Sequence, residues 1–271
     1  MSSEQMQGRP WWDRCGAWLL RASSPWMIAA LVLVAIATIA RTWGDFPLND
    51  DWQYARAAKI LAETDSLVID TPIAPSLIGQ LFLAWPLLKI FGFSHLLLRL
   101  LTMAVAVFLL WALDRILAHA QIARATRIKA LVLVALNPWF ANLALSFMTE
   151  CHGYALALAG AVVWLTGRRR NDLRQSPAAV SLWAALLAGA LTGASFWIRQ
   201  FCVVVYPALL LATLYRLVID RSWSRLWRSL WRMAAGLAVF AGIIAAYFTW
   251  ARHAQQLKTP FSGPLGQMLH F

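Results

Sequence analysis

The sequence predicts an all-α protein, a polytopic bundle of transmembrane helices. Hydrophobic residues make up 61% of the chain and the mean hydropathy is +0.60, both well above the values of soluble domains. Apolar runs of about 20 residues, the length that crosses a bilayer, recur along the chain. Sixteen tryptophans fit aromatic belts at the membrane surfaces. We expect about eight hydrophobic segments, near residues 26–43, 76–93, 95–117, 129–147, 152–167, 180–198, 201–219 and 233–251.

The first apolar segment follows a basic N-terminal segment, residues 1–25. Two interpretations stay open for it. It is either a cleaved signal peptide, since residues 37–40 resemble a small-residue cleavage site, or an uncleaved membrane anchor. The long basic segment, and Trp26 and Trp43 at the two ends of the run, favour the anchor. In both cases the residues that follow are exported.

The loop between the first two apolar segments, residues 44–72, is the acidic part of the chain. It holds half of the twelve Asp and Glu residues, and its net negative charge predicts an external position. Carboxylates at the edge of a bilayer are costly and tend to be functional. The acids of this loop are Asp45, Asp50, Asp51, Glu63, Asp65 and Asp70.

Within this loop, residues 47–63 predict a short juxtamembrane helix. Asn49 or Asp50 can cap its N-terminus. Capping needs only one such residue, so the adjacent pair Asp50 and Asp51 has a carboxylate that capping does not require. This carboxylate is either a general base or a ligand for a polar substrate or for a divalent cation such as Mg²⁺ or Mn²⁺. In the alternative interpretation both acids only cap the helix. The apolar face of the helix comprises Tyr54, Ala58 and Leu61.

The basic connections at residues 114–129, 168–174 and 216–232 are expected in the cytoplasm by the positive-inside rule. They account for the net charge of +12 without a nucleic-acid-binding surface. One inconsistency remains, because two segments separate the external loop from residues 114–129, where an odd number of crossings is required. Either segment 76–93, which contains Pro86, is re-entrant or half-crossing, or the charge rule fails for 114–129.

Residues 222–232 predict a separate interfacial helix that lies on the inner leaflet. Trp223, Trp227 and Trp231 share one helical stripe, and the arginines lie mostly off it. Its expected role is membrane anchoring.

Two further polar positions stand between apolar segments on the external side. A carboxylate at Glu150 is expected to face the protein interior or a water-filled cavity. The nearby His152 suits a hydrogen bond to phosphate or a proton shuttle, and otherwise a satisfied interface residue. Arg199, followed by Gln200, can bind a phosphate bidentately or simply snorkel at a helix end.

Several classes of function are excluded by missing motifs. The chain has no Gly-rich phosphate loop, no nucleophile elbow and no zinc signature, so a nucleotide-dependent soluble catalytic domain is not expected. The three cysteines lie far apart and predict neither a disulfide framework nor a metal site.

Short motifs follow one another in order at the ends of the apolar segments. They are residues 49–56 (Asn-Asp-Asp-Trp-Gln-Tyr-Ala-Arg), Pro75, residues 91–94 (Phe-Gly-Phe-Ser), Arg99 and residues 147–150 (Phe-Met-Thr-Glu). This order, over residues 26–219, resembles the GT-C class of membrane glycosyltransferases. The resemblance is to family 39-like bacterial enzymes related to dolichyl-phosphate-mannose protein mannosyltransferases.

The resemblance implies transfer of a sugar from a polyprenyl-phosphate donor to a lipid, glycan or protein acceptor on the external face of the inner membrane. Asp50 or Asp51 would act as base or position the acceptor. Glu150, where the family usually has Asp, would assist. The expected substrate-binding residues are Tyr54, His152, Arg199 and Gln200.

The resemblance also implies a domain organisation. A cytoplasmic segment, residues 1–25, would precede a transmembrane domain at 26–251 and an external tail at 252–271. Family members commonly run longer, so the chain is expected to be a shortened or minimal form.

Two rival interpretations stay open. One is a non-enzymatic membrane protein, such as a transporter, lipid-glycan flippase or assembly subunit, because intramembrane charges also mark transport pathways. The other is a degenerate glycosyltransferase kept for partner binding.

Overall fold

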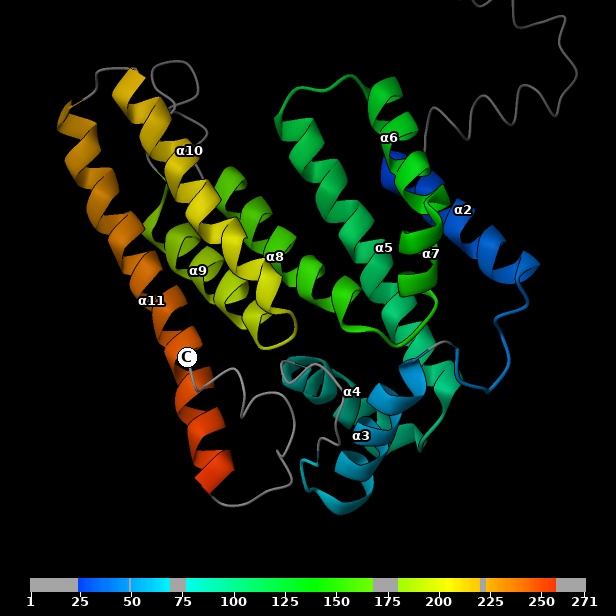
Figure 1. The fold of residues 1–271 in the computed structure, drawn as a ribbon. Helices are drawn as coiled ribbons and strands as arrows, with labels where there is room; N and C mark the ends of the chain where they lie inside the picture. The colour runs from blue at the N-terminus through cyan, green and yellow to red at the C-terminus, as the bar shows by residue number, and fades with distance from the viewer. Residues whose placement is uncertain (1–23, 49, 69–76, 168–179, 220–222, 257–271) are drawn as a thin grey trace, which may run out of the picture.

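The computed structural model describes residues 24–48, 50–68, 77–167, 180–219 and 223–256, and these residues form an all-helical bundle without β-strands (Figure 1). The prediction of an all-α protein is confirmed for them. The elements are α2 (Pro25–Ile39), α3 (Asp51–Thr64), α4 (Ile78–Phe91), α5 (His95–His119), α6 (Arg124–Leu136), α7 (Pro138–Ala144), α8 (Thr149–Thr166), α9 (Leu182–Phe196), the 3-10 helix η3 (Gln200–Val204), α10 (Val205–Ile219) and α11 (Trp223–Gln256).

Among the described residues, three stretches are helical, long and apolar enough to cross a membrane, at His95–His119, Gln200–Ile219 and Ser229–Arg252. This indicates a helical membrane protein. About eight hydrophobic segments were expected, but only these three of the described helices have the length and hydropathy of a span. The apolar helices α2, α4 and α9 have 14 or 15 residues, which is about 21–23 Å of helix against a hydrocarbon core of about 30 Å.

Segment 129–147 is two helices rather than one. Asn137 lies between α6 and α7, and its side-chain oxygen accepts hydrogen bonds from the backbone N–H groups of Trp139 and Phe140. Pro138 has no N–H to continue the ladder of α6 and disfavours helical backbone at the residue before it. The expectation of a single span here is therefore wrong, and a capped break replaces it.

The interfacial helix predicted at residues 222–232 is not a separate element. Trp223 opens α11, which continues for 34 residues to Gln256 as one helix (Figure 1). No proline falls within it, so nothing in the sequence forces a turn between the Trp-rich end and the apolar stretch. Trp227 and Trp231 are exposed, but they lie on the first turns of this long helix.

Small residues let three helices approach closely. α9 packs between α8 and α11, and a Cβ on Gly189 would lie 2.2 Å from the carbonyl oxygen of Gly236 in α11. One turn further along α9, a Cβ on Gly160 of α8 would lie 2.6 Å from the Thr192 side chain. Inside a bilayer such backbone contact takes the place of the hydrophobic effect in holding helices together.

α4 has both ends at the same end of the bundle. The N–H of Gly79, near its start, donates to the carbonyl of Trp197 just after α9 (2.9 Å). Lys89, in its last turn, pairs with Asp65 at the end of α3 (2.8 Å). Figure 1 shows α3 and α4 together at this end, opposite the connection between α5 and α6.

This arrangement bears on the inconsistent count of crossings. Because α4 stays at one end, a single passage along α5 separates the acidic loop from the basic residues after it. Of the two alternatives, the structure therefore favours the one in which segment 76–93 is re-entrant or half-crossing.

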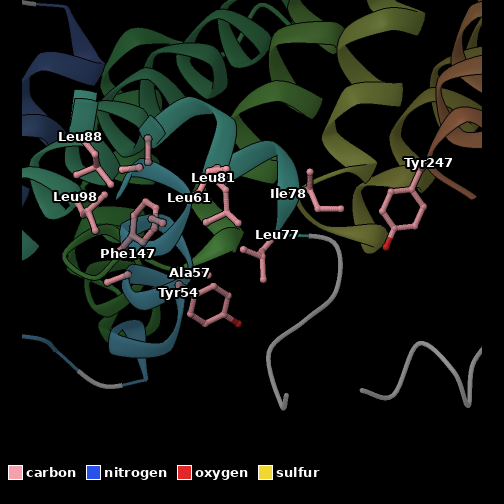
Figure 2. Close-up of a cluster of buried hydrophobic side chains, with 14 of the residues drawn as sticks. Tyr54, Ala57, Leu61, Leu77, Ile78, Leu81, Leu88, Leu98, Phe147 and Tyr247 are labelled. Atoms are coloured by element: carbon pink, nitrogen blue, oxygen red, sulfur yellow. The ribbon is translucent and has the colours of Figure 1, made fainter. Parts of the chain in front are cut away.

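A hydrophobic cluster joins α3 and α4 to the bundle (Figure 2). The face predicted for the juxtamembrane helix is confirmed, since all three of its residues are buried in this cluster. Phe147, just before α8, lies among side chains of α3, α4 and α5. The labelled members are Tyr54, Ala57, Leu61, Leu77, Ile78, Leu81, Leu88, Leu98, Phe147 and Tyr247.

The close contact of α9 with α11 can be tested by adding one methyl group. Gly189→Ala is expected to lower the free energy of unfolding by about 2 kcal/mol, because the methyl meets a backbone carbonyl that cannot move aside. The matched control is Gly242→Ala in α11, where nothing lies within 4 Å and the substitution removes the helix penalty of glycine. Thermal unfolding in detergent micelles measures both, and equal stability of the two variants would contradict the contact.

Candidate functional site

Asp51 joins the acidic loop to the start of α8. Its Oδ1 accepts a hydrogen bond from the N–H of Leu48 (2.8 Å), and its Oδ2 accepts one from the N–H of Phe147 (3.3 Å). The residue is 2% exposed. Burial raises the pKa of this carboxyl above its ordinary value of 3.8, and the two N–H donors act in the opposite direction. Both oxygens of Asp51 are thus engaged in holding backbone.

Arg99 holds the same loop from α5. Its Nη1 donates to the carbonyls of Thr42 and Gly44, and its Nη2 donates to that of Phe46 (2.6 Å). Its guanidinium also lies over the Phe46 ring, 5.2 Å from the centroid. Arg99 is 1% exposed. The planar fork of arginine suits such binding to several acceptors, which a lysine ammonium cannot reproduce.

Asp45 fixes the loop at a third point. Its Oδ1 accepts from the Ser94 hydroxyl and the Leu96 N–H, both at 3.0 Å, at the N-terminus of α5. The bond from Leu96 is the main reason why the pKa of Asp45 lies below 3.8. A carboxylate at this position also complements the dipole of α5.

Asp50 differs from its neighbour. It occupies the N-cap position of α3, but its backbone ψ is 3° and its side chain makes no capping hydrogen bond. An N-cap residue normally has extended backbone, which aims its side chain at the first turn. The expected capping by Asp50 is therefore wrong, and the alternative cap, Asn49, lies outside the described residues. Asp50 is exposed beside the anchored loop.

The structure brings Glu150 and Arg199 into direct contact. The Oε1 of Glu150 lies 2.7 Å from the Nη2 of Arg199, and the two side chains are 16% and 25% exposed. The Thr149 hydroxyl donates to Glu150 Oε2 (3.4 Å) and accepts from Arg199 Nη1 (3.5 Å). α8 begins at Thr149, earlier than predicted, so Glu150 lies in the first turn of the helix.

The backbones of these two segments also meet closely. A Cβ on Gly153 of α8 would lie 2.7 Å from the Cβ of Arg199. Glycine at this position lets the chain after α9 approach α8, and this approach brings the guanidinium within reach of Glu150.

His152 points into the protein rather than toward a ligand. It is 1% exposed, its Nδ1 bonds the carbonyl of Met148 (3.1 Å), and its ring packs edge-on against Phe147. Its Nε2 is buried without a hydrogen-bond partner. This position is that of a buried interface residue rather than of a substrate contact, although only one of its two ring nitrogens is satisfied.

Tyr54 and Gln200 are the other residues expected to bind substrate. Tyr54 is 8% exposed and packs in the hydrophobic cluster, so its position supports a packing role. Gln200 follows Arg199 directly, opens η3 and is half-buried.

The predicted residues thus divide into groups. Glu150 and Arg199 form one pair, and Asp51 reaches Phe147, three residues before Glu150. All of them lie at the same end of the bundle, as predicted from their positions at segment ends.

Within the described ranges no group of three or more His, Cys, Asp and Glu side chains lies close together as a metal site. The predicted carboxylate pair is divided, because Asp51 uses both oxygens for backbone N–H groups and leaves Asp50 as a single ligand.

Two anchoring residues were missed as site residues. Arg99 was noted only as part of the family-like order of motifs, and Asp45 only as one acid among six. A lone arginine inside an otherwise apolar segment was the available signal for Arg99, since such a charge is retained only with partners.

No family model, curated protein or solved structure matches the chain. The arrangement itself offers an exposed carboxylate on a fixed loop and an arginine fork at the start of a helix.

The three-carbonyl anchor predicts local stability of the loop. Arg99→Lys is expected to speed hydrogen exchange of amides in residues 42–48 by about tenfold, because an ammonium cannot replace the fork. Arg115→Lys, at an exposed position of the same helix, is the control and should change nothing. Exchange followed by mass spectrometry measures this, and unchanged protection in Arg99→Lys would refute the anchoring role.

The two anchored carboxylates predict opposite effects of pH. With its pKa raised by burial, Asp51 binds its proton more tightly in the folded protein, so its contribution to the free energy of unfolding falls as pH rises from 3.8 through that pKa. With its pKa lowered, Asp45 contributes stability above pH 3.8 that is lost as pH falls through its folded pKa.

Melting temperatures across this pH range, compared among the wild type, Asp51→Asn and Asp45→Asn, test the two signs. Asp51→Asn should remove a contribution to stability that falls with rising pH, whereas Asp45→Asn should remove a contribution that rises with pH. The same change of slope in both variants would show that burial does not dominate at Asp51.

Proposed function

We propose that this protein is a membrane glycosyltransferase that moves a sugar from a polyprenyl-phosphate donor to a lipid, glycan or protein acceptor. The observation that carries the proposal is the gathering of the anchored acidic loop and the Glu150–Arg199 pair at one end of an apolar helical bundle. A lipid-linked donor needs this combination, with polar chemistry at the membrane surface and apolar helix faces for its tail. The motif order described above supports the same class.

Asp50 is the base in this proposal. Removal of the acceptor hydroxyl proton requires a carboxylate that substrate can reach. Asp50 is exposed, whereas Asp51 is buried and engaged by two backbone donors. Asp51 therefore positions the loop, and the choice that the sequence left open between the two acids falls on Asp50.

Arg199 binds the donor phosphate. Its guanidinium stabilises the charge that develops as the phosphate departs. The acceptor oxygen forms a bond to the anomeric carbon, the bond from that carbon to the phosphate oxygen breaks, and the acceptor proton passes to Asp50. A single displacement of this kind inverts the anomeric configuration and consumes no nucleotide. Nothing in it is routed through a metal ion.

The finer topology belongs to the same proposal. The segments that run the length of the bundle cross an inner membrane, with the short helices completed by surrounding protein, and the N-terminus is cytoplasmic. The site end is then external, and the basic residues at the start of α6 face the cytoplasm.

The alternative is a non-enzymatic membrane protein: a transporter, a lipid-glycan flippase or an assembly subunit. The degenerate transferase is a variant of it. A transfer assay separates these functions from an enzyme.

Transfer of radiolabelled sugar from polyprenyl-phosphate donors, in membranes with matched expression, is the direct test. Asp50→Asn is expected to lower the rate by about 100-fold or more, as loss of a general base does. Asp65→Asn is the matched control, because its exposed ion pair with Lys89 contributes little stability and it should keep wild-type activity.

Transfer by wild type with an unimpaired Asp50→Asn variant would move the base elsewhere. No transfer by wild type with any donor would favour the non-enzymatic alternative.

A further inference from the structure

In the arrangement that the structure shows, Glu150 is paired with Arg199 and competes with any phosphate for its guanidinium. The contact between Nη2 and Oε1 is 2.7 Å, a short charge-assisted distance. The other terminal nitrogen, Nη1, reaches the Thr149 hydroxyl. Both arms of the fork are therefore engaged by neighbouring residues of α8.

Glu150 occupies the place where an anionic ligand would be favoured. It lies in the first turn of α8, an 18-residue helix whose N-terminus favours negative charge. Thr149 adds a hydroxyl that contacts both Glu150 and Arg199. A carboxylate in this position competes for the same donors that a phosphate oxygen would use.

The ion pair is suited to exchange. Its two side chains are 16% and 25% exposed, so neither charge is sealed in the interior, and separating them does not strand a buried ion. The Arg99 anchor is different, since that guanidinium is 1% exposed.

We propose that Glu150 is an internal counter-ion that exchanges with the phosphate of a polyprenyl-phosphate lipid on Arg199. This inference rests on the proposed function for the identity of the lipid. The phosphate enters as Glu150 turns away, and the re-formed ion pair displaces the phosphate after the sugar has left. Glu150 is then a positioning residue whose carboxylate opposes lipid binding.

The exchange predicts that neutralising Glu150 changes the affinity for the lipid phosphate in the opposite direction from that expected for a residue that binds the ligand. If Glu150 contacted the substrate favourably, its neutralisation would weaken binding. If Glu150 competes with the phosphate for Arg199, its neutralisation tightens binding of the lipid phosphate. The lipid phosphate that is left after transfer is then retained. The departing lipid is a phosphate monoester, which carries more charge than the diester donor, so release of this product is the step that most needs a competing carboxylate.

The test is equilibrium binding of a fluorescent short-chain prenyl monophosphate to the full chain in detergent micelles, with the matching prenyl alcohol as probe control. Glu150→Gln is expected to lower the Kd for the monophosphate by about fivefold and to leave that for the alcohol unchanged. Arg199→Ala should weaken monophosphate binding, and Arg199→Ala combined with Glu150→Gln should show no tightening relative to Arg199→Ala alone.

Glu150→Asp provides a second variant, since it keeps the charge but shortens the side chain by one methylene. It should bind the monophosphate more tightly than wild type, though less tightly than Glu150→Gln does. Unchanged or weaker binding in the folded Glu150 variants overturns the exchange. Tighter monophosphate binding by Glu150→Gln, in a protein that transfers no sugar, supports the exchange and refutes the transferase. Sugar transfer by the wild type without tighter binding by Glu150→Gln supports the transferase and refutes the exchange.

Discussion

The bridge that Asp51 makes between two backbone segments is the constraint on which the rest of this end of the molecule depends. Its carboxylate binds the N–H of Leu48 in the loop and that of Phe147 before α8, residues far apart in the sequence. Phe147 is thereby fixed in the cluster that seats α3 and α4, and the start of α8 is fixed with it. Burial of the carboxylate opposes its ionisation. The contact that fixes the loop against the bundle therefore has a cost in folding free energy.

Much of the fold could be predicted, because apolar runs predict the helices and the Arg-rich connections between them predict where the helices end. The segment boundaries fall close to the helices observed, and the packing face of the juxtamembrane helix follows from helical spacing alone. Breaks and continuations were harder. Pro138 divides one expected span, whereas nothing divides α11, and a hydropathy average over about 20 residues is insensitive to both.

The candidate site could be predicted as a set of residue types but not as a set of contacts. Carboxylates and arginines at segment ends were noticed because charge is costly there. Which of them pair depends on helix packing, since Glu150 and Arg199 meet only where Gly153 lets two segments touch. Likewise, the sequence around Asp50 and Asp51 does not show which of the two adjacent acids is buried. Asp51 is buried because it lies against Phe147, a contact that depends on how distant segments pack.

The length of α11 has a consequence for how the molecule sits in a bilayer. Its 34 residues extend for about 51 Å, well beyond a hydrocarbon core of about 30 Å. Within α11, Ser229–Arg252 has the length and the apolar character of a span, and Trp227 before it is exposed. With that stretch across a bilayer, the turns before it would emerge into the headgroup region, and the match between apolar length and hydrocarbon thickness would set the depth of the helix. A thicker membrane would draw these turns inward against the desolvation of their charges, whereas a thinner one would be met by tilt.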